Sequence, residues 1–402
     1  MEAPMIPLAE RIKQIKPSPT LAVDAKAKAL KAGGADILNF SVGEPDFDTP
    51  LHVREAGKAA IDGGFTRYTP VPGILELRQA ICRRYAEDRG WQYEPDQIQV
   101  SCGGKHGLYN MAQVLFNPGD EVLIPTPYWV SYPPIIQLAG GTPVFVPLAE
   151  ERNFDLDPAI LRDYVTDRTR GIILNSPSNP TGSVLSRQAL EAVAQLAVER
   201  NWIIISDDIY DTIVYGDGGL PHILDIDPAL QARTLVLNGV SKSFAMTGWR
   251  IGYTAGPKHI IAAMNKIQSQ STSNPSSVAQ KAALAAAAGP QDFPVEMKKA
   301  FLPRRDYIVR ELTGIPRVTC VVPKGAFYVF PNFSAYYGKS VKGRVIDGSV
   351  ALADYLLEEA LLATVPGIAF GCDPFIRFSF ATSMAIIEKG MARLREALAA
   401  LA

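Results

Sequence analysis

Residues 170–182 have the sequence RGIILNSPSNPTG, and residues 202–210 have the sequence WIIISDDIY. In both segments an apolar run of four to six residues ends in polar residues, which is typical of a buried strand in a parallel sheet. Five further runs of this kind lie between about residues 97 and 255: IQVS, EVLIP, TPVFVP, TLVLN and RIGYTAG. The sequence therefore predicts an α/β fold with a mostly parallel, seven-stranded sheet and helices on both faces.

The segments between the predicted strands carry helical periodicity. It is clearest at residues 186–200, SRQALEAVAQLAVER, where apolar residues recur every three or four positions. Ser186 is placed to accept a hydrogen bond from the backbone of the first turn. Such a sheet binds its ligands beyond the carboxyl ends of its strands.

The pattern changes after about residue 289. The elements expected there are a helix over 294–312, the strand GAFYVF, a helix over 349–361, the strand FIRFSF and a final helix from Met384. We therefore expect a large domain over residues 46–289 and a smaller α+β domain over 290–402. Residues 1–45 contain several prolines and a partly helical pattern, and we expect them to pack with the smaller domain.

The composition is that of a soluble globular protein. Of the 402 residues, 47% are apolar and 20% are charged, and 40 basic and 41 acidic side chains leave a net charge of −1. This length predicts roughly two domains. The balanced charge indicates no nucleic-acid partner, and the chain has neither a signal-peptide pattern nor an apolar stretch of about 18 residues. We expect a protein that is neither exported nor membrane-bound.

Cysteine and histidine are rare and scattered. The four cysteines show no CxxC spacing, and the chain has only four histidines. Neither a metal site nor a disulfide framework is predicted. This usage favours a reducing, cytoplasmic environment.

Polar residues follow three of the predicted strands. The turn NPTG comes after RGIILN, the pair Asp207 and Asp208 after WIIIS, and Lys242 after TLVLN. An amide, an acid and an amine in one crevice suit a cofactor that is bound covalently through a carbonyl and whose ring nitrogen needs a counter-ion. Lys242 alone is equally consistent with a surface loop. Ser241 and the phosphate-binding geometry of Arg250 favour the cofactor.

The segment SKSFAMTGWRIGY, residues 241–253, resembles the lysine segment of class I aminotransferases. The resemblance extends over nearly the whole chain, through KPSPTLAV, SVGEPDFDTP, YTPVPGILELR, PYWVSY, NSPSNPTG, SDDIYD and FIRFSFA. It implies the fold type I architecture of pyridoxal phosphate enzymes. It also implies a ping-pong transfer of amino groups between amino-acid and 2-oxo-acid substrates.

The resemblance implies roles for matching residues. Lys242 would hold pyridoxal phosphate as a Schiff base and then move a proton as a general base, which requires a neutral amine. Cationic neighbours, including Arg250, are expected to lower its pKa. Asp207 would keep the ring nitrogen protonated, while Tyr210 and Asn179 would bind the ring oxygen. Asp208 is expected to be only a structural neighbour.

Further matches imply how the cofactor phosphate and ring are held. The helix start in SCGGKHGLYN attracts anions, and the phosphate-binding residues implied are Gly103, Gly104, Lys105, Ser241 and Arg250. Trp129 matches the aromatic residue that stacks on the pyridine ring. Tyr68 corresponds to a tyrosine that reaches the phosphate of a neighbouring subunit. This implies a homodimer whose active site is shared across the interface.

The resemblance also implies a substrate-binding set. Arg377 matches the arginine that binds the substrate α-carboxylate through two hydrogen bonds, and the backbone of Gly43 closes from the other side. The residues expected to bind substrate are Gly43, Lys105, Trp129, Asn179 and Arg377.

Lys105 carries the information on substrate choice. A lysine in the first turn of a helix opposes the helix dipole, so we expect an anion beside it. The GGK form and Thr20 resemble the bacterial and plastid-type aspartate aminotransferases, which use this lysine to recognise acidic substrates. Aspartate or glutamate is therefore the expected donor. Some members of that subgroup also aminate prephenate, and the stretch SQSTSNPSS offers hydroxyls but no arginine, so prephenate and aromatic substrates stay open.

Three other functions compete with an aminotransferase. A carbon–sulfur lyase would share Lys242, Asp207 and Arg377, although Lys105 argues against it. A non-enzymatic, pyridoxal-phosphate-binding regulator would carry a DNA-binding module ahead of SVGEPDFDTP, which begins by residue 41. A nicotinamide dehydrogenase would show GxGxxG after its first strand, and no such motif occurs.

Overall fold

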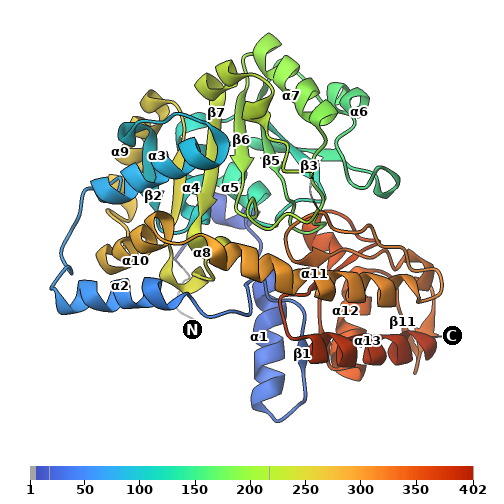
Figure 1. Cartoon of the computed structure of the whole chain (residues 1–402). Coiled ribbons are helices and arrows are strands. Elements are labelled where there is room, and N and C mark those ends of the chain that lie inside the picture. Colours follow the sequence, from blue (N-terminus) through green and yellow to red (C-terminus); the bar gives the residue numbers. More distant parts are fainter. Residues whose placement is uncertain (1–5, 18, 217, 402) are drawn as a thin grey trace.

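The computed structural model describes residues 6–17, 19–216 and 218–401 (Figure 1). Thr20 belongs to the resemblance that indicates the substrate, but its side chain lies outside the described residues. No helix within these ranges is long and apolar enough to cross a membrane.

The seven predicted strands form one sheet. In spatial order it is β2-β8-β7-β6-β5-β3-β4. The strands are β2 (Ile98–Ser101), β3 (Glu121–Thr126), β4 (Thr142–Pro147), β5 (Thr169–Asn175), β6 (Ile203–Asp207), β7 (Thr234–Gly239) and β8 (Gly252–Ala255). Strand β8 is antiparallel to both of its neighbours, and every other pair in this sheet is parallel. The prediction of a mostly parallel, seven-stranded sheet is confirmed.

Helices cover both faces of this sheet because successive strand residues point to opposite sides. On β6, Ile204 packs into a core with α3 (Leu75–Arg89), α7 (Arg187–Glu199) and α10 (Ser277–Ala288). The next residue, Ile205, packs into a second core with α4 (Gly104–Leu115), α5 (Tyr132–Leu138) and α9 (Lys258–Ser271). The predicted cap of α7 is confirmed, because Ser186 Oγ accepts a hydrogen bond from Ala189 N at 3.1 Å.

A separate core lies at the other end of the chain. It contains α11 (Asp292–Thr313), α12 (Ser349–Glu359) and α13 (Met384–Ala399), which pack with a three-stranded sheet of β13 (Val365–Pro366), β14 (Ile376–Ser379) and β9 (Tyr328–Val329). Figure 1 shows α12 and α13 beneath α11, away from the large sheet. The helices predicted over 294–312 and 349–361 and from Met384 are all present.

The N-terminal elements contact this last core. Strand β1 (Leu38–Asn39) pairs in parallel with β12 (Leu362–Ala363). Ala27 of α1 (Pro19–Ala32) packs with Ala363 in a small apolar cluster. The remaining elements are α2 (Leu51–Asp62), which packs on α10, and the short α6 (Pro158–Asp163), α8 (Val240–Ser243), β10 (Ser340–Val341) and β11 (Arg344–Val345).

The strand register sets the position of the polar residues. Asn175 of β5 is opposite Asp207 of β6, which in turn is opposite Leu237 of β7. Strands β5 and β6 therefore end at the same level, and β7 continues beside them for two more residues, to Gly239. The turn with Asn179 and the short helix with Lys242 follow within a few residues of that edge.

Candidate active site

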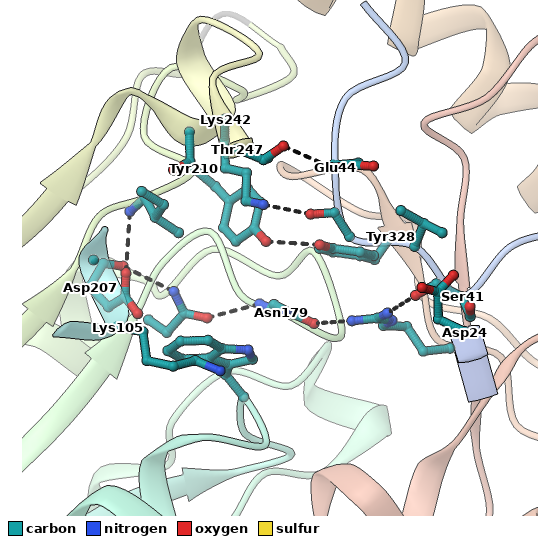
Figure 2. A pocket seen from close by; sticks show the side chains of 18 of the residues that line it. Asp24, Ser41, Glu44, Lys105, Asn179, Asp207, Tyr210, Lys242, Thr247 and Tyr328 are labelled. Carbon is teal, nitrogen blue, oxygen red and sulfur yellow. Dashed lines mark hydrogen bonds between the residues drawn. The ribbon is translucent and has the colours of Figure 1, made fainter. Parts of the chain in front are cut away.

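A cavity of about 510 Å³ lies where the carboxyl edge of the large sheet meets β9, β14 and the segment after β1. Of the residues predicted for the site, those that line this cavity are Gly43, Gly104, Lys105, Trp129, Asn179, Asp207, Tyr210, Ser241, Lys242, Arg250 and Arg377. Figure 2 shows side chains from distant parts of the chain converging on the cavity, among them those of Lys105, Asn179, Asp207, Tyr210 and Lys242. Gly103 and Tyr68 are not among the lining residues.

Lys242 extends into the cavity from α8, directly after β7. Its Nζ donates a hydrogen bond to the carbonyl oxygen of Gly43 at 2.5 Å (Figure 2). The pKa of the amine is lowered to about 8, mainly by burial and to a smaller extent by the charges of Arg250 and Arg377, against the opposing charges of Glu44 and Asp207. The sequence predicted this direction but attributed it to charge, whereas burial is the larger cause.

Asp207 ends β6 and is buried. Its Oδ2 accepts a hydrogen bond from the Tyr132 hydroxyl at 2.6 Å, and its Oδ1 accepts one from the backbone N–H of Ile209 at 3.4 Å. Burial raises the pKa of the carboxyl to about 6, although both hydrogen bonds act in the opposite direction. In the described part of the chain no cation forms a salt bridge with it. The site therefore presents a buried carboxylate suited to a cationic N–H donor.

A chain of hydrogen bonds joins the sheet edge to β14. Asn175 donates to the carbonyl oxygen of Asp207 at 2.9 Å and accepts from the backbone N–H of Asn179 at 2.8 Å. The side-chain oxygen of Asn179 then accepts from Arg377 Nη1 at 2.9 Å. Arg377 Nη2 donates to the carbonyl oxygen of Ser41 at 2.6 Å. The amide and the guanidinium predicted from separate motifs are in direct contact.

Arg377 is a buried cation without a carboxylate partner among the described residues. Its side chain is only 3% exposed, and its Nε has no hydrogen-bond partner. The guanidinium carbon lies 4.5 Å from the ring centroid of Tyr328. A buried charge is costly unless it is paired. The arrangement therefore suits an anionic ligand group such as a carboxylate.

The start of α4 and Arg250 form a cradle suited to an anion. Gly103 has φ 85°, which favours glycine, and a Cβ at this position would displace the guanidinium of Arg250. A Cβ on Gly252 would lie 2.3 Å from the backbone nitrogen of Gly104, so β8 is packed tightly against the helix start. Arg250 Nη1 is held by the carbonyl oxygen of Thr247 at 3.0 Å. Exposed backbone N–H groups beside a guanidinium are a typical phosphate site.

Lys105 and Trp129 form one wall of the cavity. The amine of Lys105 lies 5.1 Å from the ring centroid of Trp129, within the range of a cation–π contact. Burial and the nearby charge of Arg250 lower the pKa of Lys105. Within the described ranges Lys105 forms no salt bridge, so none of the described acidic residues supplies the anion expected beside it.

Tyr68 differs from the other predicted residues. Its side chain is 91% exposed and does not contact the cavity of its own chain. The contact predicted for it is with another subunit, so its part in the site stays a prediction.

Several lining residues were not predicted from the sequence. Three of them form hydrogen bonds with predicted residues: Tyr132 with Asp207, Asn175 with Asn179, and Tyr328, whose hydroxyl lies 2.8 Å from that of Tyr210. Tyr132 and Tyr328 belong to PYWVSY and GAFYVF, both recognised as segments of interest. Their partners lie 75 and 118 residues away in the chain, which no local pattern indicates.

The lowered pKa of Lys242 makes the stability of the ligand-free protein depend on pH. The folded-state pKa of about 8 lies below the value near 10.4 of an unfolded lysine, so between these pH values the folded state binds fewer protons. Stability therefore rises as pH increases through this range. At pH 7, Lys242→Met is expected to raise the free energy of unfolding by about 3 kcal/mol.

Urea unfolding of both proteins at pH 7 and pH 10 measures this effect. The advantage of Lys242→Met should be largely lost at pH 10. An advantage of equal size at both pH values would contradict a lowered pKa of the buried amine.

Comparison with known proteins identifies the family. The sequence model of aminotransferase class I and II matches residues 35–394. An aspartate aminotransferase of Geobacillus stearothermophilus is 46% identical, over 98% of this chain and 100% of the relative. An aspartate/prephenate aminotransferase of Cereibacter sphaeroides is 48% identical, over 98% and 99% of the two chains. The crystal structure of the aspartate aminotransferase from Rhizobium meliloti superposes with a TM-score of 0.94 at 41% identity, over 99% of this chain and 100% of that one. The chain belongs to the class I and II aminotransferases and has their fold type I architecture.

Proposed function

We propose that the chain binds pyridoxal phosphate through Lys242 and transfers the amino group of aspartate or glutamate to a 2-oxo acid. One observation carries this proposal. Lys242, Asp207 and Arg377 line the same cavity, and yet no salt bridge joins any two of them. Each side chain can therefore bind a different ligand group: the amine a carbonyl, the carboxylate a protonated ring nitrogen, and the guanidinium a substrate carboxylate.

The residues present fit this cofactor. The cradle of Gly103 and Arg250, in which a Cβ would collide, suits its phosphate. Tyr210 and Asn179 line the cavity near Asp207 and are placed to bind the ring oxygen, and Trp129 offers an aromatic face. When bound, pyridoxal phosphate supplies a carbonyl for the substrate amine and a ring that accepts the electron pair released at the substrate carbon.

The remaining work falls to the chain itself. Lys242 Nζ, with a pKa of about 8, is neutral in a useful fraction near physiological pH and can move a proton to and from the substrate α-carbon. Arg377 and Asn179 hold the α-carboxylate, which fixes the orientation of the bond that breaks. Asp207 keeps the ring nitrogen protonated by offering it a buried carboxylate.

Lys105 is the proposed determinant of acidic substrates. It lies on the cavity wall over Trp129, and burial and Arg250 already lower its pKa, so a second substrate carboxylate would stabilise its charge. Prephenate also carries two carboxylates. An aspartate/prephenate activity, as named for the Cereibacter sphaeroides relative, is therefore the alternative that Lys105 does not exclude.

A panel of amino donors tests the proposed function. The purified protein, loaded with pyridoxal phosphate, is mixed with aspartate, glutamate, tyrosine or alanine, and its visible absorption is followed without any acceptor. Aspartate should convert the spectrum most efficiently and tyrosine and alanine less so, and Lys242→Ala should show no conversion. Prephenate is then offered as acceptor. If no donor converts the wild-type spectrum while a cysteine thioether releases its thiol, the lyase function replaces this one.

Replacement of Lys105 should separate the substrates. In Lys105→Gln the KM for aspartate is expected to rise about tenfold or more, since a charge-assisted hydrogen bond is worth roughly 1.5–3 kcal/mol. The KM for alanine, which lacks a second carboxylate, should change far less. Equal changes for both donors would indicate that Lys105 serves the cofactor phosphate instead.

We also propose two domains and a dimer. The cores on the two faces of the large sheet support a domain at residues 46–289. The core around α11 to α13 supports a second domain at residues 290–402. The pairing of β1 with β12 supports the association of residues 1–45 with this second domain. The exposed Tyr68 supports a homodimer with shared sites. The four unpaired cysteines favour the cytoplasm.

Mixing two defective chains tests the shared site. Lys242→Ala and Tyr68→Ala are each expected to lower activity, and co-refolding them should restore activity, because one site of a mixed dimer then receives Lys242 from one chain and Tyr68 from the other. Absence of recovery, with mixed dimers verified by mass spectrometry, would contradict a shared site.

A further inference from the structure

The residue that follows Asp207 belongs to a buried polar group outside the cavity. Asp208 is only 3% exposed, and its Oδ1 accepts a hydrogen bond from Ser206 Oγ at 2.6 Å. Its Oδ2 lies 3.0 Å from Nε2 of His222, which is also buried and whose ring centroid lies 4.3 Å from that of Trp91. We call Ser206, Asp208 and His222 the Asp208 trio. It has no direct contact with the cavity and no role in the chemistry above.

The hydrogen bonds of His222 fix its protonation. Its Nδ1 accepts a hydrogen bond from the backbone N–H of Leu224 at 3.1 Å, so this nitrogen carries no proton. A neutral imidazole then carries its one proton on Nε2. That N–H faces Asp208 Oδ2 and Ser206 Oγ, which lies 3.0 Å away. The histidine is therefore a neutral donor and not an imidazolium.

Proton counting then gives the charge of the trio. Asp208 receives one proton donor from Ser206 and one from His222. A carboxylate that accepts on both oxygens is in its ionised form. With a neutral serine and a neutral histidine, the trio carries one whole negative charge.

The chain does not neutralise this charge locally. No lysine or arginine in the described ranges forms a salt bridge with Asp208. The charge of Asp208 raises the pKa values of six nearby groups: Tyr85, Tyr93, Tyr132, Asp207, Asp211 and Tyr253. The tyrosines are neutral at pH 7, since their ordinary pKa lies near 10 and burial raises it further, and burial raises the pKa of Asp211 to about 7. Arg89 acts on Asp211, and Lys242 acts on Asp207 from the cavity side.

We propose that Asp208 is a positioning residue: a second, fixed negative charge behind Asp207 that strengthens the hold of Asp207 on the protonated ring nitrogen of the cofactor. The proposal rests on the proposed function for its ligand, but the charge itself is a property of the chain alone. In agreement, the charge of Asp208 raises the pKa of Asp207, although burial is the larger cause. A carboxylate with greater proton affinity is a stronger acceptor for a ring N–H.

The ligand-free protein tests the charge without any cofactor chemistry. The side-chain carboxyl of Asp207 is titrated by carbon NMR and assigned with Asp207→Asn. In Asp208→Asn its pKa should fall by about one pH unit, as expected for removal of a nearby buried charge. Ser206→Ala is the matched control, because it removes a hydrogen bond from the trio but leaves the charge. A pKa of Asp207 that changes equally in both variants, or in neither, overturns the proposal.

Nitrogen NMR of the wild-type histidines keeps the proposal testable if Asp208→Asn does not fold. The signal of His222, assigned among only four histidines with His222→Gln, should show a neutral ring protonated on Nε2 at pH 7. An imidazolium would make the trio neutral and would overturn the proposal.

Binding of pyridoxal phosphate then links the charge to the ligand. The dissociation constant should rise about tenfold in Asp208→Asn and by much less in Ser206→Ala, with a loss of ring-nitrogen protonation visible in the nitrogen NMR signal of labelled cofactor. If the wild type binds no pyridoxal phosphate, the proposed function fails, whereas normal wild-type binding with equal constants in both variants overturns this inference alone.

Discussion

The register of three parallel strands is the constraint on which the site depends. Because β5, β6 and β7 pair with Asn175, Asp207 and Leu237 at one level, the segments that leave these strands emerge side by side. A shift of one residue in β6 would turn Asp207 to the opposite face of the sheet. The apolar residues that alternate between the two sheet cores hold this register, so the packing of the cores also determines the geometry of the site.

A second feature is that charged side chains line the cavity without forming salt bridges with one another. The amine of Lys242 and the guanidinium of Arg377 donate to backbone or amide oxygens, and the carboxylate of Asp207 accepts from a phenol and a backbone N–H. Such groups cost stability in the absence of ligand. Burial also shifts the pKa of Lys242 down and that of Asp207 up, which adapts both residues to proton transfer and to a charged ring. The Asp208 trio extends this arrangement one layer further from the cavity.

Much of the fold followed from local patterns. Short apolar runs defined all seven strands, and the Ser186 cap and the three C-terminal helices lay where their periodicity indicated. The lining residues from Gly43 to Arg377 followed mainly from the family resemblance. Tyr132, Tyr328 and Asn175 could not be predicted, because their importance comes from contacts between distant segments. For the same reason Asp208 was expected to be only a structural neighbour: the sequence does not show that His222 lies beside it.

The origin of the pKa of Lys242 shows another limit of sequence reasoning. Charged neighbours are visible in a sequence, whereas the depth of burial is not, and burial is the larger cause. The prediction of substrate choice from the sequence is limited in a similar way. Lys105 indicates an acidic partner, but the shape of the cavity around it, which would separate aspartate from prephenate, is not visible in the sequence.

The central claim is that the buried amine of Lys242 is the point of cofactor attachment. Borohydride reduction of the wild-type protein with pyridoxal phosphate, followed by proteolysis and peptide mass mapping, tests it most directly. The account predicts one reduced adduct per chain, located on Lys242. An adduct on Lys105 or on surface lysines alone, with Lys242 unmodified, would contradict it.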